Sequence, residues 1–394
     1  MAAKTIADLD LQGRRVFIRV DFNVPLTPAG GVSDATRIRE SLPTITHAIE
    51  RGARVVLASH LGRPKGHPKT DLSLLPVAAY LAEALGRDVV LADEPAGDGA
   101  KKVVSDLRDG SVAMLENLRF SPGEEANDEV FARALATYAD VYVNEAFTTA
   151  HRLHASTAGM VKYVSSKGLG FHADREVKML GKLAGEVERP FVAIVGGTRV
   201  AEKIGLLENL LSRVNVLCVG GAMANTFLAA KGVPMGRSLV EPSKMPIVRA
   251  FLAKAETSGV QILLPRDLVV AGDIKAGAGT TISSTTVPED RAVFDIGPDS
   301  AAEIGAVLAR ARTVFWNGPM GVSESPAFAA GTLAVARSIA SVMGGTTVVA
   351  GSETAAAVHR AGVASSIAHI STGGEASLEF IEGKKLPGLA ALET

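Results

Sequence analysis

Short apolar runs rich in β-branched residues recur along this chain, and most are followed by a stretch with apolar residues at helical spacing. Buried strands of a parallel sheet read as continuous apolar runs, because helices cover both faces of the sheet. The alternation of such runs with helices predicts an α/β fold of parallel sheets and crossover helices. The runs are residues 15–20, 54–58, 88–91, 112–115, 141–143, 191–195, 214–219, 260–264, 313–316, 346–349 and 367–370.

These runs are too many for one ordinary sheet, and 394 residues exceed the ~100–200 of a typical domain. Two sheets that share the strands about equally are the simpler arrangement. A helical stretch at 171–188 is expected to connect the halves, because no Gly/Ser- or Pro-rich linker separates them. The crossover helices are expected to include residues 128–138, 202–211 and 300–311.

Composition excludes several classes of protein. The net charge of −1, from 41 basic and 42 acidic side chains, gives no reason to expect a nucleic-acid or membrane partner. The single cysteine, Cys218, cannot form an intrachain disulfide and is expected to be buried in a strand. Because the sequence shows no signal-peptide pattern and no apolar run of ~20 residues, we expect a cytoplasmic protein.

Basic side chains follow the apolar runs of the first half. In open parallel sheets, ligands bind outside the carboxyl ends of the strands. Arginine suits bidentate recognition of carboxylate and phosphate. Any one of these residues alone is more simply explained by a surface ion pair, but the set indicates a site for a small, multiply negative ligand. The set consists of Arg37, His60, Arg63, Arg119 and Arg152.

The runs of the second half end in glycines instead, at residues 196–197, 220–221, 318, 351 and 373–374. Glycine lets the backbone approach a ligand closely, and a helix that starts there directs amides at phosphate. Neither a Walker A pattern nor G-x-G-x-x-G occurs. The pattern favours a nucleotide on this half. A nucleotide on one half and a polyanion on the other suggest phosphoryl transfer, with a hinge that excludes water.

Other candidate residues are interpreted as structural. His151 and His154 lack a third ligand at metal-binding spacing, so packing or contact with an anion is expected. Trp316 is expected to pack in the core rather than to stack on a base. Glu124 and Glu125 are expected to form a solvated helix start.

Several motifs resemble phosphoglycerate kinase, in the same order along the chain, between about residues 15 and 392. They are RVDFNVP at 19–25, SHLGRP at 59–64, ENLRF at 116–120, AHR at 150–152 with HAST at 154–157, WNGPMGV at 316–322 and SLE at 377–379. The resemblance implies reversible phosphoryl transfer between 1,3-bisphosphoglycerate and ADP, which gives 3-phosphoglycerate and ATP. It also implies two doubly wound parallel-sheet domains joined by a helical hinge.

We accordingly expect a phosphoglycerate-binding domain at 1–170, a connecting helix at 171–189 and a nucleotide-binding domain at 190–379, with the tail at 380–394 packing back on the first. A monomer is expected. The substrate site implied by the resemblance comprises Asp21, Phe22, Asn23, Arg37, His60, Leu61, Gly62, Arg63, Arg119 and Arg152.

The resemblance further implies that MgATP or MgADP binds the second half, with Glu353 as the Mg²⁺ ligand. The catalytic cations would be Arg37, Arg199 and Lys203. The nucleotide site would comprise Gly197, Lys203, Gly221, Asn317, Glu324, Gly351, Ser352, Glu353, Thr354, Gly373 and Gly374.

The sequence departs from the family pattern mainly on the nucleotide side. Arg199 replaces a lysine, Glu353 an aspartate, Glu375 the third glycine of a Gly-Gly-Gly helix start, and Ala222 another glycine. In the first half, NEAFT at 144–148 has Glu145 and Thr148 where Asp and Gly are usual. Turnover is therefore expected to be reduced. Two alternatives stay open: a related carboxylate kinase, and a catalytically impaired homologue that binds metabolites.

Overall fold

The computed structural model describes residues 3–393, and the chain divides into two compact units. One unit runs to Lys178 and takes up the chain again from Lys385 onward, and the other is Met179–Lys384. Helix α6 (Phe171–Ala184) crosses the division, which therefore falls within the predicted connector. The returning segment begins at Lys385 rather than at residue 380.

The first unit holds a six-stranded parallel sheet of order β3-β4-β2-β1-β5-β6. Five of these strands match predicted apolar runs. The prediction missed β6, because its sequence Ser-Lys-Gly-Leu has a weak apolar signal. The strands are β1 (Arg15–Arg19), β2 (Arg54–Ala58), β3 (Val89–Leu91), β4 (Val112–Met114), β5 (Val141–Asn144) and β6 (Ser166–Leu169).

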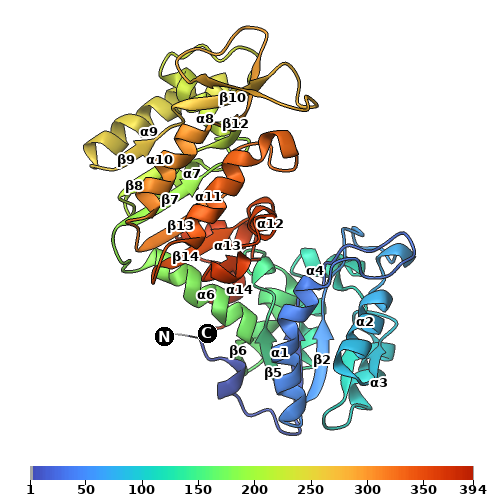
Figure 1. The fold of residues 1–394 in the computed structure, drawn as a ribbon. Helices are drawn as coiled ribbons and strands as arrows, with labels where there is room; N and C mark the ends of the chain where they lie inside the picture. The colour runs from blue at the N-terminus through green and yellow to red at the C-terminus, as the bar shows by residue number, and fades with distance from the viewer. Residues whose placement is uncertain (1–2, 394) are drawn as a thin grey trace. The chain divides into compact units, whose positions relative to one another are not determined.

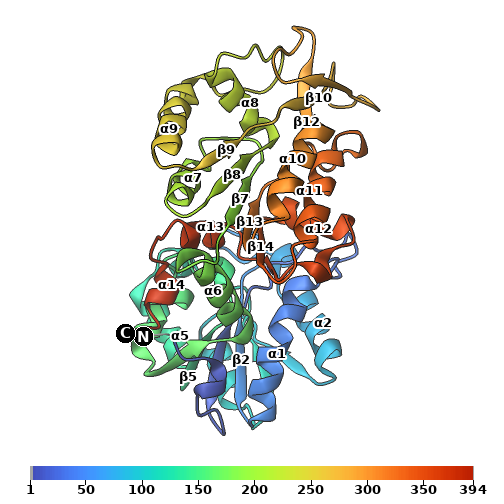
Figure 2. The ribbon, with the colours of Figure 1, turned by 60° about the vertical axis from the view of Figure 1, so that its left-hand side comes forward.

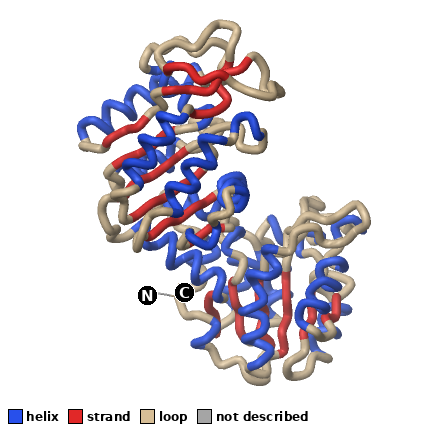
Figure 3. The backbone as a smooth tube through the Cα atoms, in the orientation of Figure 1, coloured by secondary structure: helices blue, strands red, loops and turns tan. Residues whose placement is uncertain are grey.

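Both faces of the central strands are buried, which explains their continuous apolar sequences. Val16 and Ile18 of β1 point to a core that also contains Ile45 of α1 (Thr36–Glu50) and Leu81 of α2 (Leu75–Leu85). Phe17, between them, is fully buried on the opposite face and stacks on Tyr142 of β5 with ring centroids 6.0 Å apart. Figures 1 and 3 show the strands of this unit flanked by helices.

The second unit repeats this plan with a six-stranded parallel sheet of order β15-β14-β13-β7-β8-β9. Trp316 and Cys218 are fully buried in its core, as predicted. The prediction of two parallel α/β sheets is therefore confirmed. The strands are β7 (Phe191–Val195), β8 (Val216–Val219), β9 (Gln261–Leu263), β13 (Thr313–Asn317), β14 (Thr346–Ala350) and β15 (His369–Ser371).

A three-stranded antiparallel sheet of order β11-β10-β12 also belongs to the second unit and was not predicted. It comprises β10 (Asp267–Ala271), β11 (Thr280–Ser283) and β12 (Ala292–Ile296). Strand β11, Thr-Thr-Ile-Ser, is largely exposed and lacks the apolar run on which the prediction depended. Figure 2 shows β10 and β12 beside α8 (Gly221–Ala230) at one end of this unit.

Most of the remaining helices lie between strands as crossover segments, whereas α13 and α14 follow the last strand, β15. The predicted helices at 128–138, 202–211 and 300–311 correspond to α5, α7 and α10. No helix among the described residues is both long and apolar enough to cross a membrane. The bounds of these helices are α3 (Asp98–Ser105), α4 (Pro122–Glu125), α5 (Glu129–Ala136), α7 (Ile204–Leu211), α9 (Met245–Thr257), α10 (Pro298–Leu308), α11 (Ala330–Ala340), α12 (Ser352–Arg360), α13 (Glu375–Ile381) and α14 (Pro387–Ala390).

A buried carboxyl group caps the start of α6. Glu145 accepts hydrogen bonds from the backbone N–H groups of His172 and Ala173, both at 3.2 Å, and from the Thr44 hydroxyl at 2.6 Å. Thr44 in turn accepts the Phe171 N–H at 2.8 Å. Burial raises the pKa of Glu145 to about 8, while these hydrogen bonds act in the opposite direction. The family-atypical Glu145 thus satisfies amides that a helix start leaves without intrahelical partners.

Thr44→Val is expected to lower the free energy of unfolding by about 1–3 kcal/mol, because it removes one donor to a buried carboxylate and one acceptor for a helix amide. Urea unfolding followed by circular dichroism measures the change. Amide hydrogen exchange at Phe171 should accelerate in the variant.

The matched control is Thr137→Val, because the exposed Thr137 hydroxyl bonds only the nearby carbonyl oxygen of Ala134 in the described contacts. Equal stability losses in the two variants would contradict the role given to Thr44.

Candidate functional site

The carboxyl end of β1 and the first turn of α1 bring Asp21 and Arg37 together. Arg37 Nη1 donates to Asp21 Oδ2 at 2.7 Å, and the Thr148 hydroxyl donates to the same oxygen at 2.6 Å. Burial would raise the pKa of the Asp21 carboxyl, but the positive charge of Arg37 and the hydrogen bonds from Thr148 and Asn23 lower it below its ordinary value. Asp21 is therefore held as an anion that orients the Arg37 guanidinium.

Two further predicted residues are linked through the backbone of Gly62. The Gly62 N–H donates to Asn23 Oδ1 at 2.9 Å, and the Gly62 carbonyl accepts Arg119 Nη1 at 2.9 Å. Arg119 Nε also forms an ion pair with Glu125 at 3.1 Å. The Gly62 backbone, in the loop after β2, thus fixes the side-chain amide of Asn23 and the guanidinium of Arg119 relative to each other.

The other predicted residues of the first half differ in exposure. Arg63 and Arg152 are exposed at the ends of their loops, where they can reach an anion. The side chains of Phe22 and Leu61 lie in the apolar core. Phe22 and Leu61 can therefore contact a ligand only through their backbones.

A buried arginine, Arg19, lies beneath these groups and was not among the predicted site residues. Arg19 is 1% exposed, and its Nη2 lies 3.2 Å from His60 Nδ1. Burial lowers the pKa of His60 well below its ordinary value, and the positive charges of Arg19, Arg119 and Arg37 act in the same direction, against the charge of Asp21. His60 is therefore neutral near pH 7. The sequence signals for Arg19 were its place as a charged residue at the end of an apolar run and its position as the first residue of the motif at 19–25.

Glu124 is fully buried, so the predicted solvated helix start is wrong for this residue. It accepts hydrogen bonds from Ser156 Oγ at 2.5 Å and from the Ser156 N–H at 3.0 Å. Burial raises the pKa of Glu124, and nearby Arg19 opposes the shift. A short helix start with two adjacent glutamates is normally solvated, which is why the sequence pattern was misleading. Glu125, the second of the pair, is exposed as expected.

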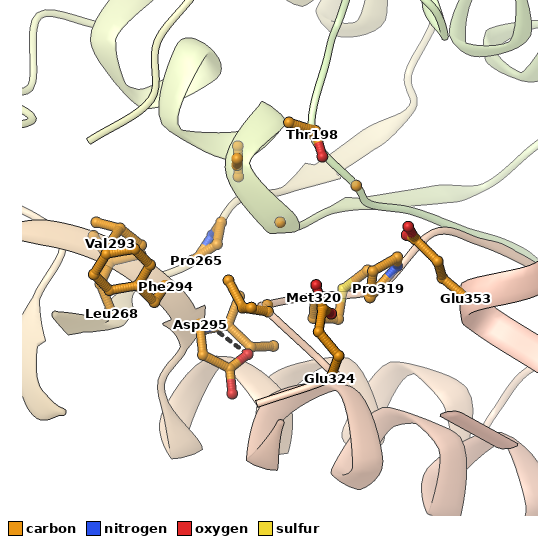
Figure 4. Close-up of a pocket in the computed structure, with 17 residues that line it drawn as sticks. Thr198, Pro265, Leu268, Val293, Phe294, Asp295, Pro319, Met320, Glu324 and Glu353 are labelled. Atoms are coloured by element: carbon orange, nitrogen blue, oxygen red, sulfur yellow. Dashed lines mark hydrogen bonds between the residues drawn. The ribbon is translucent and has the colours of Figure 1, made fainter. Parts of the chain in front are cut away.

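The second unit contains a small pocket of about 110 Å³ (Figure 4). This is less than the ~300–1,000 Å³ of pockets that enclose a whole small ligand, so only part of a nucleotide would lie inside it. Leu268, Val293 and Phe294 lie at one end, and Glu353 lies at the other. The pocket thus combines an apolar end with a charged end.

Four of the predicted nucleotide-site residues line this pocket, namely Gly197, Gly221, Glu324 and Glu353. The sequence prediction missed its apolar wall, because that wall comes from the unpredicted antiparallel sheet. It also missed Asp295, a buried carboxyl that accepts the N–H groups of Ile296 at 2.9 Å and Gly331 at 2.8 Å. Burial raises the pKa of Asp295 to about 7.

The glycines at these strand ends pack backbone against backbone. Gly221 has a φ of +64°, and a Cβ atom on it would lie 2.5 Å from the Gly197 nitrogen. A Cβ on Gly318, with a φ of +93°, would lie 2.3 Å from the Gly196 carbonyl oxygen. Neither site can accommodate a side chain. These glycines therefore form a floor of main-chain atoms beside the pocket.

Lys203 is held against this floor. Its ammonium donates to the Gly196 carbonyl at 2.6 Å and to the Asn317 carbonyl at 3.3 Å. Burial lowers the pKa of Lys203 to about 8, although Glu353 and Glu202 favour its charged form. The lysine is thus a cation near pH 7 that can lose its proton at mildly alkaline pH.

The other predicted residues surround the floor. Asn317 donates to the Ala350 carbonyl at 2.9 Å, and the Gly318 N–H donates to the Thr354 hydroxyl at 2.7 Å. Gly351 has a φ of +96° just before α12, whose first turn carries exposed Ser352 and Glu353.

Gly373 and Gly374 lie between β15 and α13, outside the pocket lining, and Glu375 begins α13. Arg199 is exposed and pairs with Glu202 at 3.5 Å.

An exposed carboxylate suits Mg²⁺, which prefers oxygen ligands and commonly takes one or two carboxylates together with substrate phosphates. Glu353 fits this chemistry. No group of three or more His, Cys, Asp or Glu side chains within residues 3–393 forms a metal cluster by protein ligands alone. Glu353 would therefore hold a metal only together with a nucleotide.

Comparisons with known proteins agree with this arrangement. A family model described as Phosphoglycerate kinase matches residues 6–384. The chain is 54% identical over 396 residues to the phosphoglycerate kinase of Anaeromyxobacter dehalogenans strain 2CP-C, and 52% identical over 393 residues to that of Moorella thermoacetica. These alignments cover 100% of this chain, and 100% and 99% of the relatives.

Solved structures of the same family resemble the whole chain. The phosphoglycerate kinase of Coxiella burnetii superposes with a TM-score of 0.92 and 37% identity, covering 99% of both chains. That of Pyrococcus horikoshii OT3 gives a TM-score of 0.83 and 31% identity, covering 100% of this chain and 98% of the other.

Thr148→Val is expected to raise the pKa of Asp21, because it removes a hydrogen bond that stabilises the carboxylate. Thr148→Ser keeps the hydroxyl and should leave this pKa near the wild-type value. Carbon-13 NMR titration of the carboxyl, assigned with Asp21→Asn, measures the shift.

Thr149→Val provides the neighbouring control, since the Thr149 hydroxyl donates to the Ala146 carbonyl and not to Asp21. An unchanged Asp21 pKa in Thr148→Val would show that the hydroxyl does not stabilise this carboxylate.

Proposed function

The chain belongs to the phosphoglycerate kinase family, and we propose that the groups around Asp21 bind the phosphoglycerate while the pocket of the second unit binds the nucleotide. The enzyme is a phosphotransferase that transfers a phosphoryl group reversibly between 1,3-bisphosphoglycerate and ADP, giving 3-phosphoglycerate and ATP. This function is assigned from the full-length sequence identity to enzymes named phosphoglycerate kinase. None of these relatives favours the carboxylate-kinase or metabolite-binding alternative.

The substrate assignment is supported by charge and geometry in the first unit. A phosphorylated carboxylate carries two anionic ends, and bidentate guanidinium groups match both of them. Arg37 is oriented by Asp21, and Arg119 is fixed by the Gly62 carbonyl, so both cations are positioned before the substrate arrives. The proposed site comprises Asp21, Phe22, Asn23, Arg37, His60, Leu61, Gly62, Arg63, Arg119 and Arg152, with Phe22 and Leu61 acting through their backbones.

The nucleotide assignment is supported by the two-ended pocket. The apolar wall suits a base, and the phosphates would extend toward Lys203 and Glu353. Gly197 and Gly221 bring the main chain close to the ligand at the pocket wall. The remaining members of the proposed site are Asn317, Glu324, Gly351, Ser352, Thr354, Gly373 and Gly374.

We propose that Mg²⁺ enters with the nucleotide and that Glu353 is its protein ligand. The ion would neutralise charge on the phosphate oxygens during transfer. Exposed Glu353 can reach such an ion, although its extra methylene gives the carboxylate a different position from that of an aspartate.

Phosphoryl transfer depends on positioning and on cations rather than on covalent chemistry by the protein. Arg37 would stabilise charge on the carboxylate side, and Lys203 would hold a phosphate at a fixed point beside the glycine floor. Arg199 is bound only to exposed Glu202 in the described contacts and would turn toward the transferring group. Glu375 at the start of α13 places negative charge near the proposed Gly373 and Gly374 contacts, which supports the expectation of reduced turnover. A cytoplasmic location and a monomeric state remain predictions.

Arg119→Ala and Arg152→Ala are each expected to weaken 3-phosphoglycerate binding at least tenfold, because each removes a guanidinium from the proposed anion site. Isothermal titration calorimetry with 3-phosphoglycerate measures this effect, and ADP affinity should stay unchanged. Arg133→Gln, which removes an exposed arginine paired with Glu129, is the control. Wild-type phosphoglycerate affinity in both alanine variants would refute the substrate assignment.

The pH dependence of ADP binding tests Lys203. The free enzyme loses the Lys203 charge as pH rises through about 8, whereas bound phosphate favours the charged form. ADP binding at pH 8.5 should therefore take up protons, and ADP affinity should fall more steeply above pH 8 than in Lys203→Arg. Calorimetry in two buffers of different ionisation enthalpy measures the uptake. Equal proton uptake by wild type and Lys203→Arg would contradict this role.

A further inference from the structure

The buried cluster of Arg19, Glu124 and Ser156 lies next to the proposed substrate site but contains none of its predicted residues. Arg19 Nε donates to Ser156 Oγ at 2.8 Å, and the Ser156 hydroxyl donates onward to Glu124 Oε1 at 2.5 Å. Arg19 and Glu124 are 1% and 0% exposed. Burying an unpaired charge is strongly destabilising, so the serine bridge between the two opposite charges is what makes the buried arginine tolerable.

The Arg19 guanidinium has its other contacts fixed as well. Nη1 donates to the carbonyl oxygen of Val20, and Nη2 points to His60 Nδ1 at 3.2 Å. Every nitrogen of an arginine side chain is a hydrogen-bond donor, and none is an acceptor. His60 Nδ1 must therefore be the acceptor in this contact.

We propose that Arg19 is a positioning residue that holds His60 in the neutral form with its proton on Nε2, so that His60 donates a hydrogen bond to the anionic substrate from that nitrogen. A neutral imidazole has one donor and one acceptor nitrogen, and occupation of Nδ1 as acceptor fixes the donor at Nε2. Glu124 and Ser156 keep Arg19 in place. This inference rests on the proposed phosphoglycerate site.

The charges that face His60 agree with this assignment. Arg19, Arg37 and Arg119 disfavour a second proton on the imidazole, and Asp21 is the carboxylate that favours one. Burial adds to the effect of the three arginines. A charged His60 would also have no acceptor to offer Arg19, because both imidazolium nitrogens are donors.

Nitrogen-15 NMR of the ligand-free enzyme at pH 6 tests the proposal directly. The His60 signals, assigned by their loss in His60→Gln, should show an unprotonated Nδ1 and a protonated Nε2. In Arg19→Met, the histidine should become a mixture of tautomers or gain a second proton at this pH. Arg19→Lys, which keeps a buried positive donor, should restore the wild-type tautomer at least in part.

If Arg19→Met does not fold, the double variant Arg19→Met/Glu124→Gln removes both buried charges and should make the same change in His60. Steady-state kinetics supply a second readout. The KM for 3-phosphoglycerate should rise about tenfold in Arg19→Met with a smaller change in kcat, because the lost contact acts on substrate binding. Arg133→Gln serves again as the control for loss of an arginine.

A protonated Nδ1 in the wild-type enzyme, or a His60 tautomer that Arg19→Met leaves unchanged, would overturn the proposal. A different result would overturn the substrate site instead. If 3-phosphoglycerate leaves the His60 signals unshifted and His60→Gln keeps the wild-type KM, the Arg19–His60 contact stands but does not serve this substrate.

Discussion

Parallel pairing of buried strands is the constraint on which the rest of the structure depends. Because all strands of each six-stranded sheet run in the same direction, their carboxyl ends meet at one edge. Side chains that are distant in sequence, such as Asp21, His60 and Arg119, therefore come together without any long-range sequence signal. The same geometry in the second unit gathers glycine turns instead of arginines. One architecture thus carries two different kinds of site, and the residues after each strand decide which.

The first site concentrates positive charge in a chain whose net charge is −1. This cluster of positive charges is stable because the more deeply buried cations form ion pairs or hydrogen bonds. Arg37 pairs with Asp21, Arg119 with Glu125, and buried Arg19 with Glu124 through a serine. Arg63 and Arg152 at the rim are exposed. The contacts of Arg37, Arg119 and Arg19 hold these three cations in fixed positions.

Sequence reasoning located most strands of the two parallel sheets, because the signal for a buried strand is local, and the same signal led to the proposed site residues. A buried strand is a contiguous apolar run, and the polar residue after it marks the ligand edge. The sequence-based prediction failed where the burial of a residue depends on tertiary contacts. The antiparallel sheet and its apolar pocket wall were also missed, although β10 and β12 carry short apolar runs and only exposed β11 lacks one. Glu124 is adjacent to Glu125, yet one is buried and the other exposed, because only Glu124 meets Ser156 and Arg19 in the folded chain.

The main-chain floor of the proposed nucleotide pocket has a consequence for how such a protein can change over generations. Gly196, Gly221 and Gly318 lie so close to neighbouring backbone that a single methyl group would separate the strand ends. Mutational drift is blocked there, whereas positions around the floor, such as Ala222 and Glu353, can exchange side chains without disturbing the sheet. Substitutions can therefore change the side chains around the proposed nucleotide pocket, while the glycines that join the strand ends stay the same.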